Sequence, residues 1–148
     1  MSFELDVGHT CDRGPRERLE DFAAVVLPPA HQDSRGVIAA LADGVSAGGG
    51  GLEAAQTAVL AVTGDFHSAP DAWDTSVTLD RLISAHNAWL TDHNRRRQVF
   101  KDEPLCMTTL TALVLNGHGY TLGHVGDTRA YLIRGGDCVQ LTQDHTMG

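Results

Sequence analysis

Basic residues are scarce in this sequence. Lysine occurs once, at Lys101, and 11 Lys and Arg residues stand against 19 Asp and Glu residues, which gives a formal net charge of −8. Nucleic acids and anionic lipid surfaces attract positive charge, so we expect neither of them as a partner. An acid excess keeps a protein soluble, and it can also supply carboxylates for metal binding. Composition by itself makes solubility the better explanation.

Cysteine and long apolar runs are scarce as well. The three cysteines, Cys11, Cys106 and Cys138, are an odd number at wide spacing, without a Cys-x-x-Cys pair. This pattern argues against a disulfide framework and a zinc ribbon, and it indicates a reducing compartment. No apolar run approaches the roughly 18 residues of a membrane helix, and no signal peptide is visible at the N-terminus. We therefore expect a cytoplasmic protein, with no membrane contact from this segment.

Length and periodicity predict one α+β domain. A chain of 148 residues is typical of a single domain, and its hydrophobic and charged fractions, 42% and 20%, exclude wholesale disorder. Apolar residues recur every three or four positions over 52–66 and 79–90, as in amphipathic helices, and the second helix ends near three arginines at 95–97. Strands are predicted at 3–7, 22–27, 36–42, 107–115, 120–125, 129–134 and 138–141, with a hairpin loop at 31–35.

The order of these elements indicates antiparallel sheets. Strands followed by two helices and then by a meander of strands differ from the βαβ alternation of a parallel sheet. Two helices can cover only one face of one sheet, so the other face needs a second sheet. We expect a sandwich of two sheets with helices on the outside.

Acidic residues recur where the predicted strands begin or end. Glu20-Asp21 begin one strand, Asp43-Gly44 follow the next, and Asp127 follows a later strand within Gly-Asp-Thr. Adjacent strands can bring such ends together, and Mg²⁺ and Mn²⁺ prefer carboxylate, carbonyl and water oxygens. Each of these residues taken alone is more typical of an ordinary turn residue than of a metal ligand.

Five short motifs taken together resemble one protein family. In chain order they are Arg16-x-x-Leu19-Glu20-Asp21, Ala42-Asp43-Gly44-Val45, Met107-Thr108-Thr109-Leu110, Val125-Gly126-Asp127-Thr128-Arg129-Ala130-Tyr131 and Leu141-Thr142-x-Asp144-His145. Their order and their places at predicted strand boundaries resemble the PPM/PP2C family of metal-dependent Ser/Thr protein phosphatases, most of all its bacterial members. The resemblance implies a PP2C-like α-β-β-α sandwich of antiparallel sheets flanked by helices.

The resemblance also implies a site and a reaction. The family's ligands for two or three Mn²⁺ or Mg²⁺ ions match Glu20, Asp21, Asp43, the carbonyl of Gly44, and Asp127. Asp43 matches the carboxylate that bridges two ions, and Arg16 matches the arginine that binds the substrate phosphate. The implied reaction is hydrolysis of phosphoserine and phosphothreonine by a metal-bridged hydroxide. Phosphorylated proteins and a cognate Ser/Thr protein kinase are the implied partners, in bacterial signalling.

The sequence departs from the family pattern at several positions. Leu19 replaces a usual Asn, Val45 stands where some members have His, and Met107 replaces a common Gly. The family's later Asp-Gly and Asp-Asn metal motifs do not occur before Gly148. We therefore expect residues 1–148 to be a single PPM-type phosphatase domain that is truncated at its C-terminal end. The alternative is a catalytically silent phosphatase-like module that binds phosphoproteins or regulatory partners.

Three other features have simpler explanations than a functional site. The eight histidines are scattered, and His86 and His93 lack the further ligands of a zinc site. The glycines at 48–51 precede a helix without the Lys-Ser/Thr of a nucleotide P-loop. The arginines at 95–97 are typical of a solvated helix end.

Overall fold

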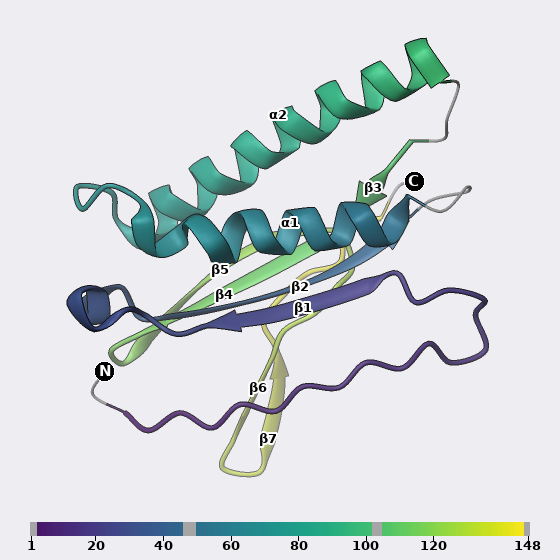
Figure 1. The fold of residues 1–148 in the computed structure, drawn as a ribbon. Coiled ribbons are helices and arrows are strands. Elements are labelled where there is room, and N and C mark those ends of the chain that lie inside the picture. The colour runs from purple at the N-terminus through teal and green to yellow at the C-terminus, as the bar shows by residue number, and fades with distance from the viewer. Residues whose placement is uncertain (1–2, 46–49, 102–104, 147–148) are drawn as a thin grey trace.

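The computed structural model describes residues 3–45, 50–101 and 105–146 (Figure 1). The chain contains seven strands, two α-helices and two short 3-10 helices in these ranges. In order they are β1 (Asp21–Val26), η1 (Ala30–Arg35), β2 (Val37–Val45), α1 (Gly51–Asp65), η2 (Phe66–Ser68), α2 (Thr75–Lys101), β3 (Met107–Thr108), β4 (Leu110–Asn116), β5 (Gly119–Val125), β6 (Tyr131–Arg134) and β7 (Asp137–Gln140).

Five of the strands form one antiparallel sheet, in the order β1-β2-β4-β5, and β3 pairs with the end of β2. The turn between β4 and β5 has only two residues, because Asn116 pairs directly with Gly119. Gly117 begins this turn at a φ of 60°, a left-handed conformation that costs glycine little. Tight connections of this kind make neighbours in the chain neighbours in the sheet.

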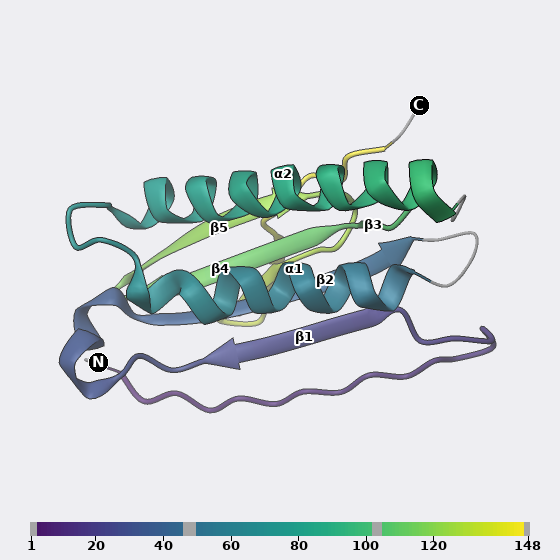
Figure 2. The same cartoon turned by 45° about the horizontal axis from the view of Figure 1, so that its top comes forward.

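One face of the sheet is covered by both helices (Figure 1, Figure 2). Side chains alternate along a strand, so every second residue of β2 faces the helices. Those residues are Ile38, Ala40 and Ala42, all buried. They pack with Ala55, Ala58, Val59, Val62, Phe66, Leu79, Leu110, Ala112 and Val114 in one hydrophobic core. Each large side chain buried there contributes roughly 1.5–3 kcal/mol to folding.

The opposite side of the sheet carries a second, two-stranded sheet of β6 and β7 (Figure 1). These strands are joined at Gly135 and Gly136, whose φ values of 60° and 85° suit a tight hairpin turn. Helices on one side and a second antiparallel sheet on the other confirm the predicted α+β class and the sandwich arrangement. Among the described helices, none is both long and apolar enough to span a lipid bilayer.

Hydrogen bonds connect the helical layer to the sheet at the end where β2 begins. The His67 ring nitrogen Nε2 lies 2.7 Å from the carbonyl oxygen of Gly36, and both groups are buried. The Arg35 guanidinium donates to the carbonyl oxygens of Ala69 and Pro70, in the connection between α1 and α2. Hydrogen bonds satisfy these partly buried groups and fix the end of α1 to the loop that precedes β2.

Several sequence-based predictions of secondary structure were wrong. Residues 3–7 form no strand, because their alternating pattern finds no hydrogen-bonded neighbour, although Phe3 and Leu5 are half-buried as alternation requires. Residues 31–35 belong to η1 rather than to a hairpin loop. The predicted strand 129–134 begins at Tyr131. The second helix is longer than its apolar stripe, since it runs from Thr75 to Lys101.

Two further differences concern the candidate site. The predicted strand 107–115 divides into β3 and β4 at Thr109. Asp43 and Gly44 lie within β2 rather than in a turn after it, because Asp43 pairs with Asp21 and Gly44 pairs with Thr108. Part of the glycine-rich segment before α1, residues 46–49, lies outside the described residues.

Candidate active site at the Asp43 end of the sheet

Two aspartates face each other where β1 begins and β2 ends. In the antiparallel pairing Asp21 lies directly opposite Asp43. Like charges directly opposite each other destabilise a sheet, so this pair of aspartates lowers the stability of the fold. Phe22 and Ala42, the next pair, pack toward the helices, and alternation therefore directs the two carboxyl groups to the other face.

The surroundings of Asp43 favour its protonated form. Partial burial, a hydrogen bond to the Asp21 carboxyl and the negative charges of Asp21 and Asp127 raise the pKa of Asp43 to about 6. The positive charge of Arg16 acts in the opposite direction and lowers this pKa. Three charged side chains from separate segments therefore act on one carboxyl group, and the excess negative charge there suits a cation.

Thr109 fixes the backbone of Asp43. The Asp43 amide donates to the Thr109 hydroxyl at 3.0 Å, and the Thr109 amide donates to the Asp43 carbonyl at 3.0 Å. The Thr109 side chain thus replaces a ladder partner at the break between β3 and β4. These two hydrogen bonds between Asp43 and Thr109 hold the end of β2 in place where the regular strand pairing is interrupted.

Asp127 is brought to the same edge by a tight turn after β5. Gly126 has a φ of 104°, and a Cβ at this position would lie 2.7 Å from the Cβ of Thr109. The Gly126 amide donates to His145 Nδ1 at 3.2 Å, while the His145 amide donates to the Gly126 carbonyl at 2.8 Å. Glycine is needed here for both its conformation and its lack of a side chain, and the turn leaves Asp127 exposed.

Glu20 and Gly44 lie on the helix side of the same edge. The Gly44 amide donates to the Glu20 carbonyl at 2.8 Å, and the Glu20 carboxylate lies against Gly51 at the start of α1. Glu20 therefore projects to the face opposite Asp21 and Asp43. Within the described ranges, no three His, Cys, Asp or Glu side chains already form a group that could hold a metal ion.

Of the residues predicted from the sequence, Arg16, Glu20, Asp21, Asp43, Gly44 and Asp127 all lie at this end of the sheet, where β1 begins and β2 ends. The structure places Asp21 in contact with Asp43, and it places the charges of Arg16 and Asp127 within reach of Asp43. Arg16 lies on an exposed bend before β1, where a guanidinium can approach an anion from solvent.

The donor set suits a hard divalent cation. Mg²⁺ is commonly held by one or two carboxylates with several water molecules, and Mn²⁺ accepts the same oxygen ligands. Asp21 and Asp43 supply two carboxyl groups in contact, and their mutual repulsion is relieved when a cation replaces the shared proton. These residues therefore fit an ion whose remaining ligands are a carbonyl oxygen and water.

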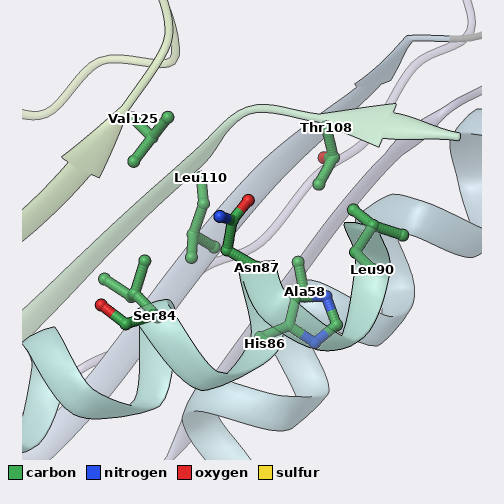
Figure 3. Close-up of a pocket in the computed structure, with 9 residues that line it drawn as sticks. Ala58, Ser84, His86, Asn87, Leu90, Thr108, Leu110 and Val125 are labelled. Atoms are coloured by element: carbon green, nitrogen blue, oxygen red, sulfur yellow. The ribbon is translucent and has the colours of Figure 1, made fainter. Parts of the chain in front are cut away.

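Of the hollows beside this edge of the sheet, two differ in the acidity of their lining. One, of about 450 Å³, is lined by Val45, Met107, Thr108, Thr109, Val125, Gly126, Asp127, His145 and Thr146. The other, of about 350 Å³, lies between α2 and the strands (Figure 3), and His86 and Asn87 are its most polar lining groups. The second hollow has no carboxylate in its lining, whereas Asp127 places the first beside the acidic residues.

Sequence reasoning assigned no role to two residues that shape the site, nor to an ion pair that adjoins one of them. Thr109 and His145 occur in the quoted motifs, yet only the folded chain shows that one holds Asp43 and the other holds the Asp127 turn. Asp144 binds the Arg129 guanidinium through two hydrogen bonds of 3.0 and 2.6 Å. Arg129 and Asp144 flank the β6–β7 hairpin in the sequence, and this placement could have predicted that the two residues pair.

Comparisons with known proteins agree with this geometry. The sequence profile described as Protein phosphatase 2C matches residues 17–147. The curated serine/threonine protein phosphatase PstP of Mycobacterium tuberculosis is 33% identical over 107 residues, which are 72% of this chain and 20% of that protein. The chain thus spans about a fifth of the length of this curated relative.

Solved structures give the same fold. The M. tuberculosis phosphatase PstP/Ppp is 28% identical with a TM-score of 0.68, over 89% of this chain and 51% of that one. The PstP catalytic domain in complex with two manganese ions has the same identity and TM-score, with 52% of its length covered. Stp1 of Staphylococcus aureus, 20% identical, shows the fold alone, with a TM-score of 0.75 over 98% of this chain and 58% of that one. Since the profile spans most of the sequence and a curated relative shares a third of the aligned residues, this chain belongs to the protein phosphatase 2C family.

Proposed function

We propose that this chain carries the first half of the active site of a metal-dependent protein phosphatase, one that hydrolyses phosphoserine and phosphothreonine. The observation that carries the proposal is the set of charges around Asp43. Asp21 contacts it, Arg16 and Asp127 act on its pKa, and Glu20 directly precedes Asp21 at the same strand end. An acidic site beside the exposed Arg16 suits a phosphate monoester that is bound together with divalent cations.

In this proposal each residue has a separate task. Asp43 and Asp21 would hold Mn²⁺ or Mg²⁺, with the Gly44 carbonyl and Glu20 as further ligands, and Asp127 would serve an additional ion. The bound ions supply a water of lowered pKa and neutralise negative charge. Arg16 binds two phosphoryl oxygens through its planar guanidinium and stabilises the charge that develops on them.

The proposed substrates and setting follow from the relatives. PstP and its solved structures are described as serine/threonine phosphatases, so phosphorylated Ser/Thr proteins are the proposed substrates, and a cognate Ser/Thr kinase in bacterial signalling is the proposed partner. The small number and wide spacing of the cysteines are the basis for proposing a reducing, cytoplasmic setting.

Phosphopeptide hydrolysis with and without Mn²⁺ tests the proposal. We expect the intact protein to release phosphate only with the metal, and Asp43→Asn to lower kcat by at least about 100-fold, because loss of a preorganised charged group commonly costs that much. Asp80→Asn, an exposed aspartate on α2, is the matched control and should keep full activity. Turnover without metal, or full turnover by Asp43→Asn, would contradict the assignment. Phosphopeptide binding without turnover would instead identify the silent module.

A further inference from the structure

Two glycines meet where the end of β2 touches the first turn of α1. A Cβ on Gly44 would overlap the carbonyl oxygen of Gly51 and lie 2.7 Å from its Cα. This approach joins two backbones, so neither side can move without shifting a strand or a helix. The contact therefore sets how closely α1 begins beside the candidate site.

Gly51 differs from Gly44 in what fills the space beside it. A Cβ on Gly51 would overlap the Oε2 atom of Glu20 and lie 2.8 Å from its Cδ, while the nearest backbone atom, the carbonyl carbon of Gly44, is 3.0 Å away. The space that a side chain would occupy is therefore taken by the Glu20 carboxylate. The first obstacle is the mobile end of a side chain. The second is backbone, which at 3.0 Å has to shift by a few tenths of an ångström to admit a Cβ.

Backbone conformation does not explain glycine at position 51. Gly51 is the first residue of α1 and is not among the glycines with positive φ, so alanine could adopt the same dihedral angles. Alanine is also the better helix former. The remaining physical reason for glycine is space, which the Glu20 carboxylate fills and which the Gly44 backbone borders at 3.0 Å.

We propose that Gly51 is a positioning residue for Glu20: its missing side chain leaves the place against the first turn of α1 in which the Glu20 carboxylate is held for metal binding. The inference rests on the proposed function, because it takes Glu20 to be a ligand. The start of α1 favours a negative charge and so stabilises the carboxylate in this place. A methyl group at position 51 displaces the carboxylate while the fold remains.

Mn²⁺ titration by calorimetry, with thermal unfolding of the same samples, tests the proposal in the intact protein. We expect Gly51→Ala to raise the Kd for Mn²⁺ about 10- to 100-fold, the usual effect of losing a group that orients a ligand. Its unfolding temperature without metal should stay close to that of the wild type. Gly64→Ala is the matched control in the same helix, because a Cβ there has nothing within 4 Å, and its Kd should not change.

A second variant tests the mechanism of the effect. Glu20→Asp shortens the side chain, so combining it with Gly51→Ala returns room for the carboxylate. If the two substitutions acted independently, their effects on the free energy of Mn²⁺ binding would add. We expect the double variant to bind Mn²⁺ more tightly than this sum predicts. A merely structural role of Gly51 would give no such rescue.

The outcomes separate the two proposals. Wild-type affinity in Gly51→Ala, independent losses in the double variant, or failure of Gly51→Ala to fold would overturn the positioning role. In the first two cases the proposed function stands if the wild type binds Mn²⁺ and hydrolyses phosphopeptides. Absence of Mn²⁺ binding in the wild type would overturn both.

Discussion

Replacing Thr109 tests whether a side chain holds the end of β2. Thr109→Val removes the hydroxyl that accepts from the Asp43 amide at 3.0 Å, and it keeps the methyl group that packs beneath Gly126. The Asp43 amide is partly buried, and a buried donor left without an acceptor costs about 1–3 kcal/mol. For a chain of this size that loss corresponds to a fall in Tm of roughly 2–12 °C.

Urea unfolding followed by circular dichroism gives the free energy of unfolding for each variant. Thr109→Ser keeps the hydroxyl and loses the methyl group, so it should be more stable than Thr109→Val. Thr91→Val is the control, because its hydroxyl donates to Asn87 on the exposed surface of α2, and such changes alter stability by no more than about 0.5 kcal/mol. A Thr109→Val protein as stable as the wild type, or more stable than Thr109→Ser, would refute the reasoning.

Two further predictions concern the core and the region after the hairpin. Phe66 is fully buried, so Phe66→Ala should lower the free energy of unfolding by about 3–5 kcal/mol, whereas Leu60→Ala, at a side chain 54% exposed in α1, should cost far less in the same urea assay. Arg129 lowers the pKa of Asp144 below its ordinary value of 3.8. The stabilisation from this pair is thus present above pH 3.8 and is lost as the pH falls through the lowered pKa. Carboxyl NMR titration should show this pKa returning to about 3.8 in Arg129→Gln, and an unchanged value would contradict the pairing.

The core and the helices could be predicted from the sequence because they depend on local periodicity. The alternation of Ile38, Ala40 and Ala42 gives the buried face of β2 directly, and the stripe of α1 follows from its three- and four-residue spacing. Residues 3–7 have the same kind of alternation, yet a strand also needs a hydrogen-bonded neighbour, which no local pattern contains. The expected strand there was wrong for that reason.

The residues of the candidate site could be predicted from the sequence, but their positions relative to one another could not. The motifs indicated Glu20, Asp21 and Asp43, while the register that sets Asp21 opposite Asp43 depends on long-range pairing. The same pairing sends Glu20 to the other face of the sheet. The role of Thr109 was hidden because a hydroxyl that replaces a ladder bond is visible only where two strands separate.

The two ends of α1 are held in different ways, one by hydrogen bonds from Arg35 and His67 and the other by close packing. These hydrogen bonds hold the connection after α1 to the start of β2, whereas the first turn of α1 rests on glycines at the opposite end of the strand. A helix of 15 residues is about 22 Å long, so a tilt of about 3° at the hydrogen-bonded end moves the other end by about 1 Å. A tilt of α1 caused by a change at Arg35 would therefore be largest beside Glu20, where the contact between Gly44 and Gly51 opposes it.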